Sequence, residues 1–600
     1  MAAAGVREWR RVVVVVSGFA ALFAVVAGRA GQLTVIDGQR LAGQAHDQQN
    51  GQLALLPLRG PIVDRGGEPL ALTVGAESLY LHPKVLRTDA DNIAPLAAAL
   101  GLPVEEVERK AHAEAPFVWL KRLANPREVA AVMEVGARGV GSLREHRRVY
   151  PRGSLAVHVL GFAGIDAQGL EGVERFYDPF IRPPSRVLEM AFDAHGRGML
   201  TMGIEPTVVP VGARVELTID APLQTVVERE LARGVAAAKA LAGTAVVLDP
   251  WTGAVLAIAN VPRFDPNKIA ASAPAVLRNR AITDMHEPGS TFKAVLAAAA
   301  LDLGVASPGD KVYCEAGRYH VGRRVIRDHH PRRWLTFAEV VQYSSNIGAA
   351  KVAESVGRDR LHSYVSAFGF GEKTDIDLPG EVTGRVLPVE RWGSLELATV
   401  SFGQGLAVTP LQMARAFAVI ANGGLLLRPY VMRRIVAPDG KVLVERTRKV
   451  TRRVVRPEVA AQVAAMLRRV VEEEGGTGRL ARLPDVAVAG KTGTAQKVDP
   501  LTGTYSATAR VASFVGFVPA DEPRVVILVM IDEPRTSPYG GVVAAPVFRE
   551  VAAAVLARVG MESGKQGQVQ EVRGRSGSGG ADGFLDTVPR AGQARPEVRA

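Results

Sequence analysis

The chain is 600 residues long, with 47% hydrophobic and 22% charged residues, so its composition excludes a collagen-like, a disulfide-knotted or a wholly disordered protein. Its length favours an organisation into several domains. Lysine and arginine outnumber aspartate and glutamate by 73 to 61, which gives a net charge of +12. This charge is compatible with binding to nucleic acid, to an anionic membrane surface or to an anionic cell-wall precursor, and does not distinguish among them. The one cysteine, Cys314, excludes an intrachain disulfide and is interpreted as a small buried hydrophobe.

The first predicted element is a membrane-spanning helix. An uninterrupted run of apolar or small residues extends over 12–28, between Arg11 and Arg29. At about 1.5 Å per residue it spans about 26 Å, which matches a hydrocarbon core if the flanking arginines snorkel. The arginines before the run predict a cytoplasmic tail at 1–11, an anchor at 12–28 and everything after Arg29 outside the cytoplasm. A cleaved signal peptide is the alternative, and this placement counts against nucleic acid as a partner.

The sequence pattern of the chain changes at about residue 205. Residues 29–205 mix short alternating runs with Gly and Pro, whereas 206–560 alternate strong strands with alanine-rich helices. The elements predicted there are a hairpin of Thr244–Leu248 and Ala254–Ala259, a buried helix over Lys293–Leu303, and two strands, Arg510–Val518 and Arg524–Ile531. This order predicts an antiparallel sheet with helices packed on it. Residues 561–600, dominated by Gly, Ser, Gln and Arg, are predicted to be a disordered tail.

Several motifs are incomplete. Gly490-Lys491-Thr492 is not a phosphate-binding loop, because position 485 is aspartate instead of glycine. His329-His330 and the adjacent Asp328 lack a metal-site spacing and are interpreted as a solvated loop, so no metal site is predicted. The basic run 446–456 lacks interleaved aromatic residues and is interpreted as a solvated face.

Ser290-Thr291-Phe292-Lys293 is the chain's only Ser-x-x-Lys, and it stands at the predicted start of a helix. Residues three apart share a helix face, so the Lys293 amine can reach the Ser290 hydroxyl. A serine needs a base beside it, and lysine serves if burial lowers its pKa from about 10.4 toward neutrality. Alone, the motif is weak evidence, and an ordinary helix start is the favoured interpretation.

Two further motifs are each unique in the chain. Ser344-Ser345-Asn346 lies in a turn before a predicted helix over Ile347–Val356, where its hydroxyl can relay a proton and its carboxamide can bind a peptide. Lys491-Thr492-Gly493 is predicted at the end of a short strand, Val486–Ala489. There the glycine permits a close backbone approach and the lysine adds charge for a carboxylate. Alone, these are a helix cap and a strand end.

Together the three motifs are those of the penicillin-recognising serine acyltransferases. From the anchor to about residue 560, the chain resembles the class B penicillin-binding proteins, membrane-anchored D,D-transpeptidases that cross-link peptidoglycan. Other stretches that carry the likeness are 59–65, 148–151, 169–174, 218–220, 249–253 and 403–405. The resemblance implies an α+β fold. Its parts are a penicillin-binding-protein/β-lactamase-like transpeptidase domain at 206–560, with helices on both faces of an antiparallel sheet, an elongated pedestal domain of the dimerisation type at 29–205, and one transmembrane helix.

The second motif distinguishes two branches of that class. Ser344-Ser345-Asn346-Ile347-Gly348 is similar to the division-specific branch, and so are 489–497 and Tyr539-Gly540-Gly541. The resemblance therefore implies a septal transpeptidase of the cytoplasmic (inner) membrane, with its catalytic domain in the periplasm. It also implies peptidoglycan stem peptides and β-lactams as ligands. The implied partners are a polytopic lipid II polymerase and other divisome membrane proteins.

The family's mechanism transfers onto matching positions of this chain. Ser290 would be the nucleophile, and Lys293 its general base. The remaining implied roles are a proton relay through Ser344 and Lys491, donor binding by Asn346, carboxylate binding by Thr492 and Thr494, close approach at Gly493, and an oxyanion hole from the backbone N–H groups of Ser290 and Thr494. No metal or cofactor is implied.

Alternatives remain open at this point. An elongation-type transpeptidase differs in branch only, and a D,D-carboxypeptidase differs in handing the acyl group to water. A secreted β-lactamase would have no use for the pedestal or for a permanent anchor. A divisome scaffold with a decayed site is the non-enzymatic alternative, against which the intact motifs argue.

Overall fold

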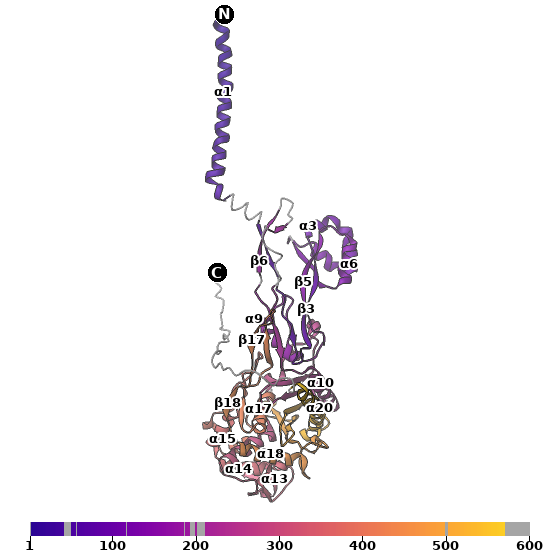
Figure 1. Ribbon diagram of the computed structural model, residues 1–600, viewed down its shortest axis with the longest axis vertical. Coiled ribbons are helices and arrows are strands. Elements are labelled where there is room, and N and C mark those ends of the chain that lie inside the picture. Colours follow the sequence, from indigo (N-terminus) through magenta and orange to yellow (C-terminus); the bar gives the residue numbers. More distant parts are fainter. Residues whose placement is uncertain are drawn as a thin grey trace.

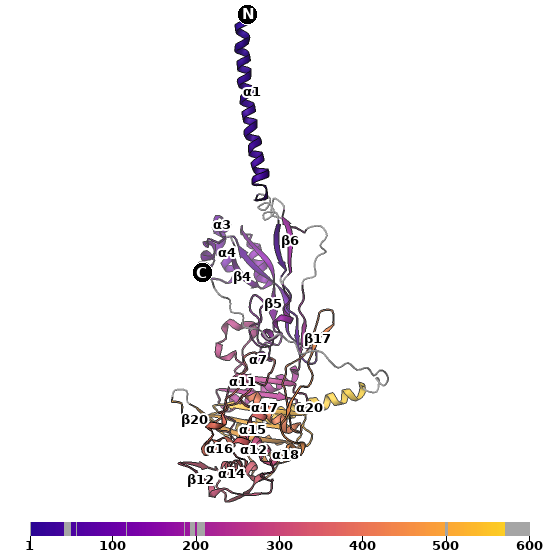
Figure 2. The ribbon, with the colours of Figure 1, turned by 90° about the vertical axis from the view of Figure 1, so that its left-hand side faces the viewer.

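The computed structural model describes residues 2–40, 50–55, 57–115, 117–184, 186–192, 198–200, 210–498 and 502–569. The protein is elongated: a lone helix stands at one end, a slender region of strands lies in the middle, and a broad body of sheet and helices lies at the other end (Figure 1). The view turned by 90° shows the same order of parts (Figure 2).

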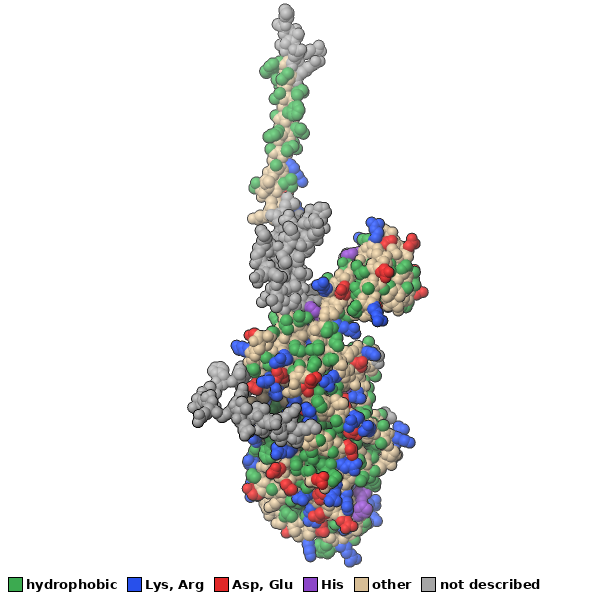
Figure 3. All heavy atoms as spheres, turned by 45° about the vertical axis from the view of Figure 1, so that its right-hand side comes forward, with side chains coloured by type: hydrophobic (Ala, Val, Ile, Leu, Met, Phe, Trp, Pro, Cys, Tyr) green, Lys and Arg blue, Asp and Glu red, His purple; other side chains and the backbone are tan. Residues whose placement is uncertain are grey.

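Helix α1 (Ala2–Gly31) carries the predicted anchor. The stretch Val12–Ile36 has a mean hydropathy of 2.2, and none of its apolar segment is buried against the rest of the protein; it is long and apolar enough to cross a membrane. Phe19 and Phe23 are 69% and 76% exposed, and Figure 3 shows hydrophobic side chains along the described part of the helix. Such a surface is stable only when something apolar, such as lipid, covers it.

The body is built on one five-stranded antiparallel sheet. Its strand order is β10-β9-β21-β20-β19, and every neighbouring pair is antiparallel. The strands are β9 (Ala242–Leu248), β10 (Val255–Val261), β19 (Ala489–Val498), β20 (Tyr505–Val518) and β21 (Val525–Asp532). The predicted hairpin and the predicted pair of late strands are thereby confirmed. The position of the strand at the third motif was predicted wrongly. β19 begins at Ala489, so Lys491-Thr492-Gly493 lies inside this edge strand and not beyond a strand's end.

Helices cover both faces of this sheet, as predicted. Along β21, Val525, Ile527 and Val529 pack with helices α10 (Ala221–Ala237) and α20 (Ala545–Val569). The alternate residues Val526 and Leu528 belong to the larger core, which includes α17 (Pro410–Ala421) and α18 (Pro457–Glu472). Alternation of side chains across a strand produces this two-sided burial. α20 continues to Val569, beyond the predicted start of the tail at 561, and 570–600 lie outside the described residues.

Within the larger core, α12 (Lys293–Asp302) is buried from Lys293 to Leu301, which confirms the buried helix predicted from its alanines. The other helices of the body are α11 (Arg280–Thr283), α13 (Phe337–Gln342), α14 (Asn346–Val356), α15 (Arg358–Ala367), α16 (Ser394–Ser401) and α19 (Gly540–Val543). Its small two-stranded sheets pair β11 (Lys311–Tyr313) with β14 (Trp334–Thr336), β12 (Arg318–Val321) with β13 (Arg324–Arg327), and β15 (Leu425–Leu427) with β18 (Val450–Arg453).

A second sheet joins the middle region to the body. Its order is β17-β16-β8-β2-β3-β4, with β5 also on β3. The strands are β2 (Ile62–Val63), β3 (Pro69–Leu81), β4 (Val118–Ala124), β5 (Val140–Val149), β8 (Arg214–Leu217), β16 (Met432–Val436) and β17 (Val442–Glu445). β8, β16 and β17 come from the segment predicted as transpeptidase domain, and β2 to β5 come from the segment predicted as pedestal, so strands of both segments share this sheet.

Small helices and strands complete the middle region. α4 (Ile93–Leu100), α5 (Val104–Ala111) and α6 (Pro126–Val135) pack on β3 and β4 around a separate core that contains Leu79, Leu96 and Leu120. The other helices are α3 (Pro83–Leu86), α7 (Val157–Leu160), α8 (Gly172–Phe176) and α9 (Asp178–Ile181), and β1 (Asn50–Leu55), β6 (Arg186–Phe192) and β7 (Gly198–Leu200) form a three-stranded sheet.

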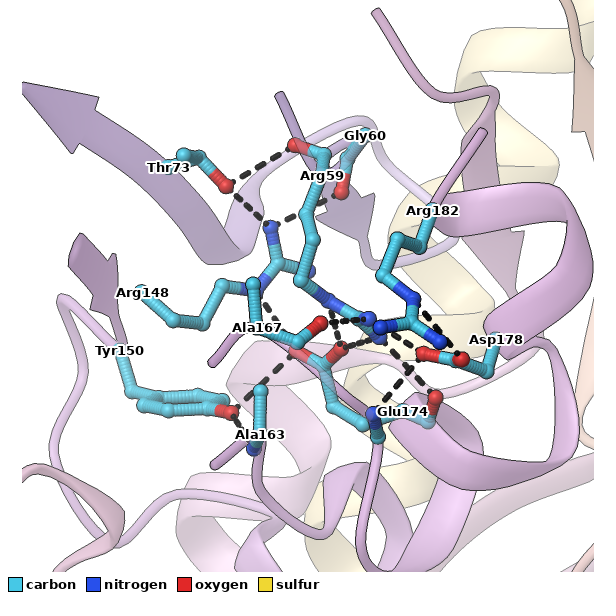
Figure 4. A network of polar contacts seen from close by, with 11 residues as sticks. Arg59, Gly60, Thr73, Arg148, Tyr150, Ala163, Ala167, Glu174, Asp178 and Arg182 are labelled. Carbon is cyan, nitrogen blue, oxygen red and sulfur yellow. Dashed lines mark hydrogen bonds and ion pairs between the residues drawn. The ribbon is translucent and has the colours of Figure 1, made fainter. Parts of the chain in front are cut away.

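Three of the stretches that carry the family likeness meet in one buried polar cluster (Figure 4). Glu174, which is fully buried, accepts hydrogen bonds from Arg59 Nη2 at 2.5 Å, from Arg148 Nε at 2.7 Å and from the Tyr150 hydroxyl at 3.2 Å. Asp178 forms a further ion pair with Arg59. Removing Glu174 would leave the buried Arg148 without an ion-pair partner among the described residues and Arg59 with Asp178 alone, so the cluster fixes how these segments pack.

The basic run 446–456 is not simply the solvated face that was predicted. Arg446 is half-buried, 3.7 Å from the buried carboxylate of Asp377. Arg452 pairs with Glu372, and Arg456 pairs with Asp302 at 3.0 Å. Because these arginines hold neighbouring segments, the run joins parts of the fold together.

Candidate active site

Ser290 lies in a 3₁₀ turn, Gly289–Phe292, that leads directly into α12. Gly289 has φ +57°, and a Cβ there would come within 2.9 Å of the Thr494 carbonyl oxygen, so only glycine fits. Its N–H donates to the Gly403 carbonyl at 3.0 Å. The predicted position of Ser290, at the N-terminus of a buried helix, is confirmed, and the serine stays partly exposed.

Lys293 lies under Ser290 and is 1% exposed. Its Nζ is 3.1 Å from Ser290 Oγ, 2.8 Å from Asn346 Oδ1 and 2.7 Å from the Ser344 carbonyl oxygen. Burial lowers the pKa of Lys293 to about 7, and the charge of Asp328 works in the opposite direction. Near neutral pH, comparable fractions of this amine are therefore protonated and neutral.

Lys491 continues the polar chain on the other side of Ser344. Its Nζ lies 3.1 Å from Ser344 Oγ, which is itself 3.2 Å from Lys293 Nζ. Ser344 has φ +62°, an unfavourable conformation for serine that turns its hydroxyl between the two amines. Complete burial, and then the nearby Lys293, lower the pKa of Lys491 well below that of a free lysine. A continuous path runs from Ser290 through Lys293 and Ser344 to Lys491.

The edge strand β19 forms one wall of the site. A Cβ at Gly493 would lie 3.0 Å from the Pro288 carbonyl oxygen, so the glycine lets the strand approach the turn before Ser290. The Thr492 and Thr477 hydroxyls are 2.9 Å apart, and the Thr494 hydroxyl accepts a hydrogen bond from Gly540 N at 3.4 Å. The Thr494 backbone nitrogen lies beside the turn, 3.5 Å from where a Cβ at Gly289 would stand.

All three motifs open into one cleft of about 870 Å³. Of the predicted site residues, Ser290, Ser344, Asn346, Thr492 and Thr494 line it directly, whereas Lys293, Lys491 and Gly493 lie buried against these residues. That volume suits a short peptide or a drug-sized molecule.

Asp328 is a site residue that the sequence analysis missed by placing it in a solvated loop. Its carboxylate accepts hydrogen bonds from Ser345 Oγ at 2.5 Å, from Asn346 N at 2.6 Å and from Ile347 N at 3.1 Å. A carboxylate on the first N–H groups of α14 stabilises that helix start and so fixes the second motif against Lys293. Its position sixteen residues before Ser344 carried no signal in a single sequence.

A serine hydroxyl beside a buried, near-neutral lysine, next to a glycine-lined edge strand, defines a serine acyltransferase of the Ser–Lys type. Comparison with known families agrees with this class. Residues 243–553 match the penicillin binding protein transpeptidase domain, and residues 54–208 match the penicillin-binding protein dimerisation domain. The chain belongs to the penicillin-binding protein family.

Curated relatives match over most of the chain. The stage V sporulation protein D of Bacillus subtilis is 34% identical over 553 residues, which cover 91% of this chain and 85% of the relative. The peptidoglycan D,D-transpeptidase FtsI of Escherichia coli is 34% identical over 550 residues and 90% of each chain. Among solved structures, penicillin binding protein 3 from Mycobacterium tuberculosis, in complex with aztreonam, has a TM-score of 0.66 at 29% identity. That match covers 85% of this chain and 97% of the solved chain.

Proposed function

We propose that this chain is the peptidoglycan D,D-transpeptidase of the division septum. The observation that carries the chemistry is the 3.1 Å contact between Ser290 Oγ and the near-neutral Lys293 amine, in a cleft bordered by β19. Support for the septal branch comes from the Ser-x-Asn-Ile-Gly second motif and from the similarity to FtsI.

The first half-reaction forms an acyl-enzyme. Ser290 Oγ attacks the carbonyl of the D-Ala-D-Ala bond while its proton passes to Lys293 Nζ. Backbone N–H groups of Ser290 and Thr494 hold the oxyanion. As the C–N bond breaks, the path through Ser344 returns a proton to the leaving amine of the terminal D-alanine.

The second half-reaction forms the cross-link. The amine of a neighbouring stem peptide attacks the Ser290 ester; the new C–N bond forms, the C–O bond to Ser290 breaks, and the proton lost by the amine passes through Lys293 to Ser290 Oγ. In the first half-reaction, before the terminal D-alanine leaves, the Thr492 and Thr494 hydroxyls bind its carboxylate, and Lys491 Nζ donates a hydrogen bond to the Thr492 hydroxyl at 3.2 Å. Asn346 orients Lys293 through its 2.8 Å contact and presents its amide to the donor peptide.

The proposal includes placement in the cell. Arginines before the apolar run of α1 favour a cytoplasmic N-terminus, which puts the cleft outside the cytoplasmic membrane. A polytopic lipid II polymerase and other divisome membrane proteins are the proposed partners, contacted through the anchor and the pedestal at 29–205. The proposed domain division is a pedestal followed by a transpeptidase domain at 206–560.

The test uses the full chain in detergent micelles with a fluorescent penicillin. We expect a stable adduct whose labelled peptide contains Ser290, and none with Ser290→Ala of unchanged melting temperature. Hours of persistence fit a transpeptidase, whereas rapid turnover of the label would indicate a β-lactamase. Release of D-alanine from a stem pentapeptide without any cross-linked dimer, even with acceptor amine present, would favour the carboxypeptidase.

A fluorescent fusion of the full chain tests the septal placement. We expect a band at the division site, and lateral wall labelling would instead favour an elongation-type enzyme.

A further inference from the structure

The cleft carries more positive charge than one terminal carboxylate requires. Three arginines line it, Arg332, Arg479 and Arg510. Among its described lining residues the one carboxylate is Asp328, which is occupied by the start of α14. An excess of this size selects for anionic ligands.

The fold indicates which of these arginines faces the donor. β19 is the edge of its sheet, so its outer side is free to pair with an extended peptide. With the terminal carboxylate at Thr492 and Thr494, and the reacting carbonyl at Ser290, the residues before D-Ala-D-Ala must run onward along β19 toward Gln496. Arg510 is the cross-strand partner of Gln496, and both residues line the cleft.

Backbone carbonyl groups hold the Arg510 side chain in place. Its guanidinium donates to the carbonyl oxygens of Ser506 at 2.9 Å, Ala507 at 3.0 Å and Ala509 at 3.1 Å. Within the described part of the chain it forms no ion pair, in contrast to Arg452 and Arg456. Backbone carbonyls orient a guanidinium but leave its charge uncompensated, which suits it to bind a carboxylate brought by a ligand.

We propose that Arg510 is a specificity-determining residue that recognises a side-chain carboxylate on the residue preceding D-Ala-D-Ala in the donor peptide. This inference rests on the proposed transpeptidase function and adds a requirement that the three motifs do not impose. The acyl side chain of a penicillin occupies the same place, so penicillins with a carboxylate there meet the same arginine.

The test compares two penicillins that differ only by one carboxylate on the acyl side chain. The second-order rate of Ser290 acylation is measured for each with the full chain and with Arg510→Gln. We expect the ratio of the carboxylated to the uncharged penicillin to fall about tenfold in the variant, because a charge-assisted hydrogen bond is lost. Because each variant provides its own ratio, a general loss of active protein cancels.

Two further variants distinguish recognition from folding. Arg510→Lys keeps the charge without the planar fork, so its ratio should lie between the other two and decrease with added salt. Arg524→Gln, in the exposed turn between β20 and β21, should keep the wild-type ratio. An unchanged ratio in Arg510→Gln would overturn the inference, whereas failure of both penicillins to acylate the wild type would overturn the proposed function instead.

Discussion

The buried Lys293 amine predicts an unusual pH dependence of acylation. With a pKa of about 7, the neutral base fraction rises from about one tenth at pH 6 to about nine tenths at pH 8. The second-order rate of penicillin acylation should therefore increase about tenfold over that interval and become flat above pH 8. An unperturbed lysine, with a pKa near 10.4, would give a rise of about a hundredfold and no plateau.

Stopped-flow fluorescence with a labelled penicillin, at constant ionic strength from pH 5.5 to 9.5, measures this profile. Lys293→Arg is the control, because arginine keeps the charge and the approximate size but cannot release its proton at these pH values. We expect that variant to lose at least about a hundredfold in rate, with no plateau. A wild-type rate that still climbs steeply above pH 8.5 would refute a lysine base tuned by burial.

The same lowered pKa has a consequence for stability. The unfolded chain holds this proton up to about pH 10.4 and the folded chain releases it near 7, so folding costs about 4–5 kcal/mol at or below pH 7. Between these two values the unfolded state binds more protons, and the free energy of unfolding must rise with pH. Lys293→Met should lack this slope, so its stability advantage over the wild type should shrink from pH 7 to 9.5 in urea titrations.

Three other substitutions test the supports of the site. Asp328→Asn removes a negative charge that favours protonated Lys293, so the midpoint of the acylation profile should move below pH 7. Glu174→Gln removes the carboxylate of Arg148 and one of the two carboxylates of Arg59, and it should cost about 3–5 kcal/mol in chemical unfolding, whereas Glu171→Gln, 47% exposed, should cost under about 1 kcal/mol. Gly289→Ala places a Cβ on a residue with positive φ and against the Thr494 carbonyl oxygen in β19, so acylation should slow. The melting temperature should also drop, because the backbone conformation alone lowers the free energy of unfolding by about 1–2 kcal/mol. An unshifted pH midpoint, equal costs for the two glutamates, or a fully active alanine variant would each contradict the corresponding contact.

The parts of the site that local geometry controls could be predicted from the sequence. Three residues along a helix return to the same face, so the contact between Ser290 and Lys293 followed from their spacing alone. The expectation that the three motifs meet in one site came from resemblance to a family, because hydrophobic periodicity does not predict contacts between distant segments. The predicted strand was ended too early, at Ala489, because Lys491, Thr492 and Gly493 are polar or small, and so carry no strand pattern although they are buried.

Contacts between distant polar residues could not be predicted. Asp328 meets the second motif only because the chain returns to it after β14 and α13, and a lone aspartate beside two histidines looks like any exposed loop. Arg59 and Glu174 are separated by 115 positions, and charged residues give no signal of burial or of a partner in one sequence. The shared sheet likewise depends on β16 returning to β8, a long-range pairing that strand propensity does not specify.

The use of lysine separates chemistry from electrostatics in this chain. Only 14 of its 73 basic residues are lysines, and of the described ones Lys293 and Lys491 alone are buried. Arginine holds the buried ion pairs of the pedestal, where a permanent charge and a planar fork are needed. The two buried lysines lie within hydrogen-bonding distance of Ser344, where the proposed mechanism needs an amine that can gain and lose a proton. Two desolvated amines and a serine at positive φ are destabilising features, and they persist because a wholly buried helix, a carboxylate-capped helix and an edge strand hold them from three sides.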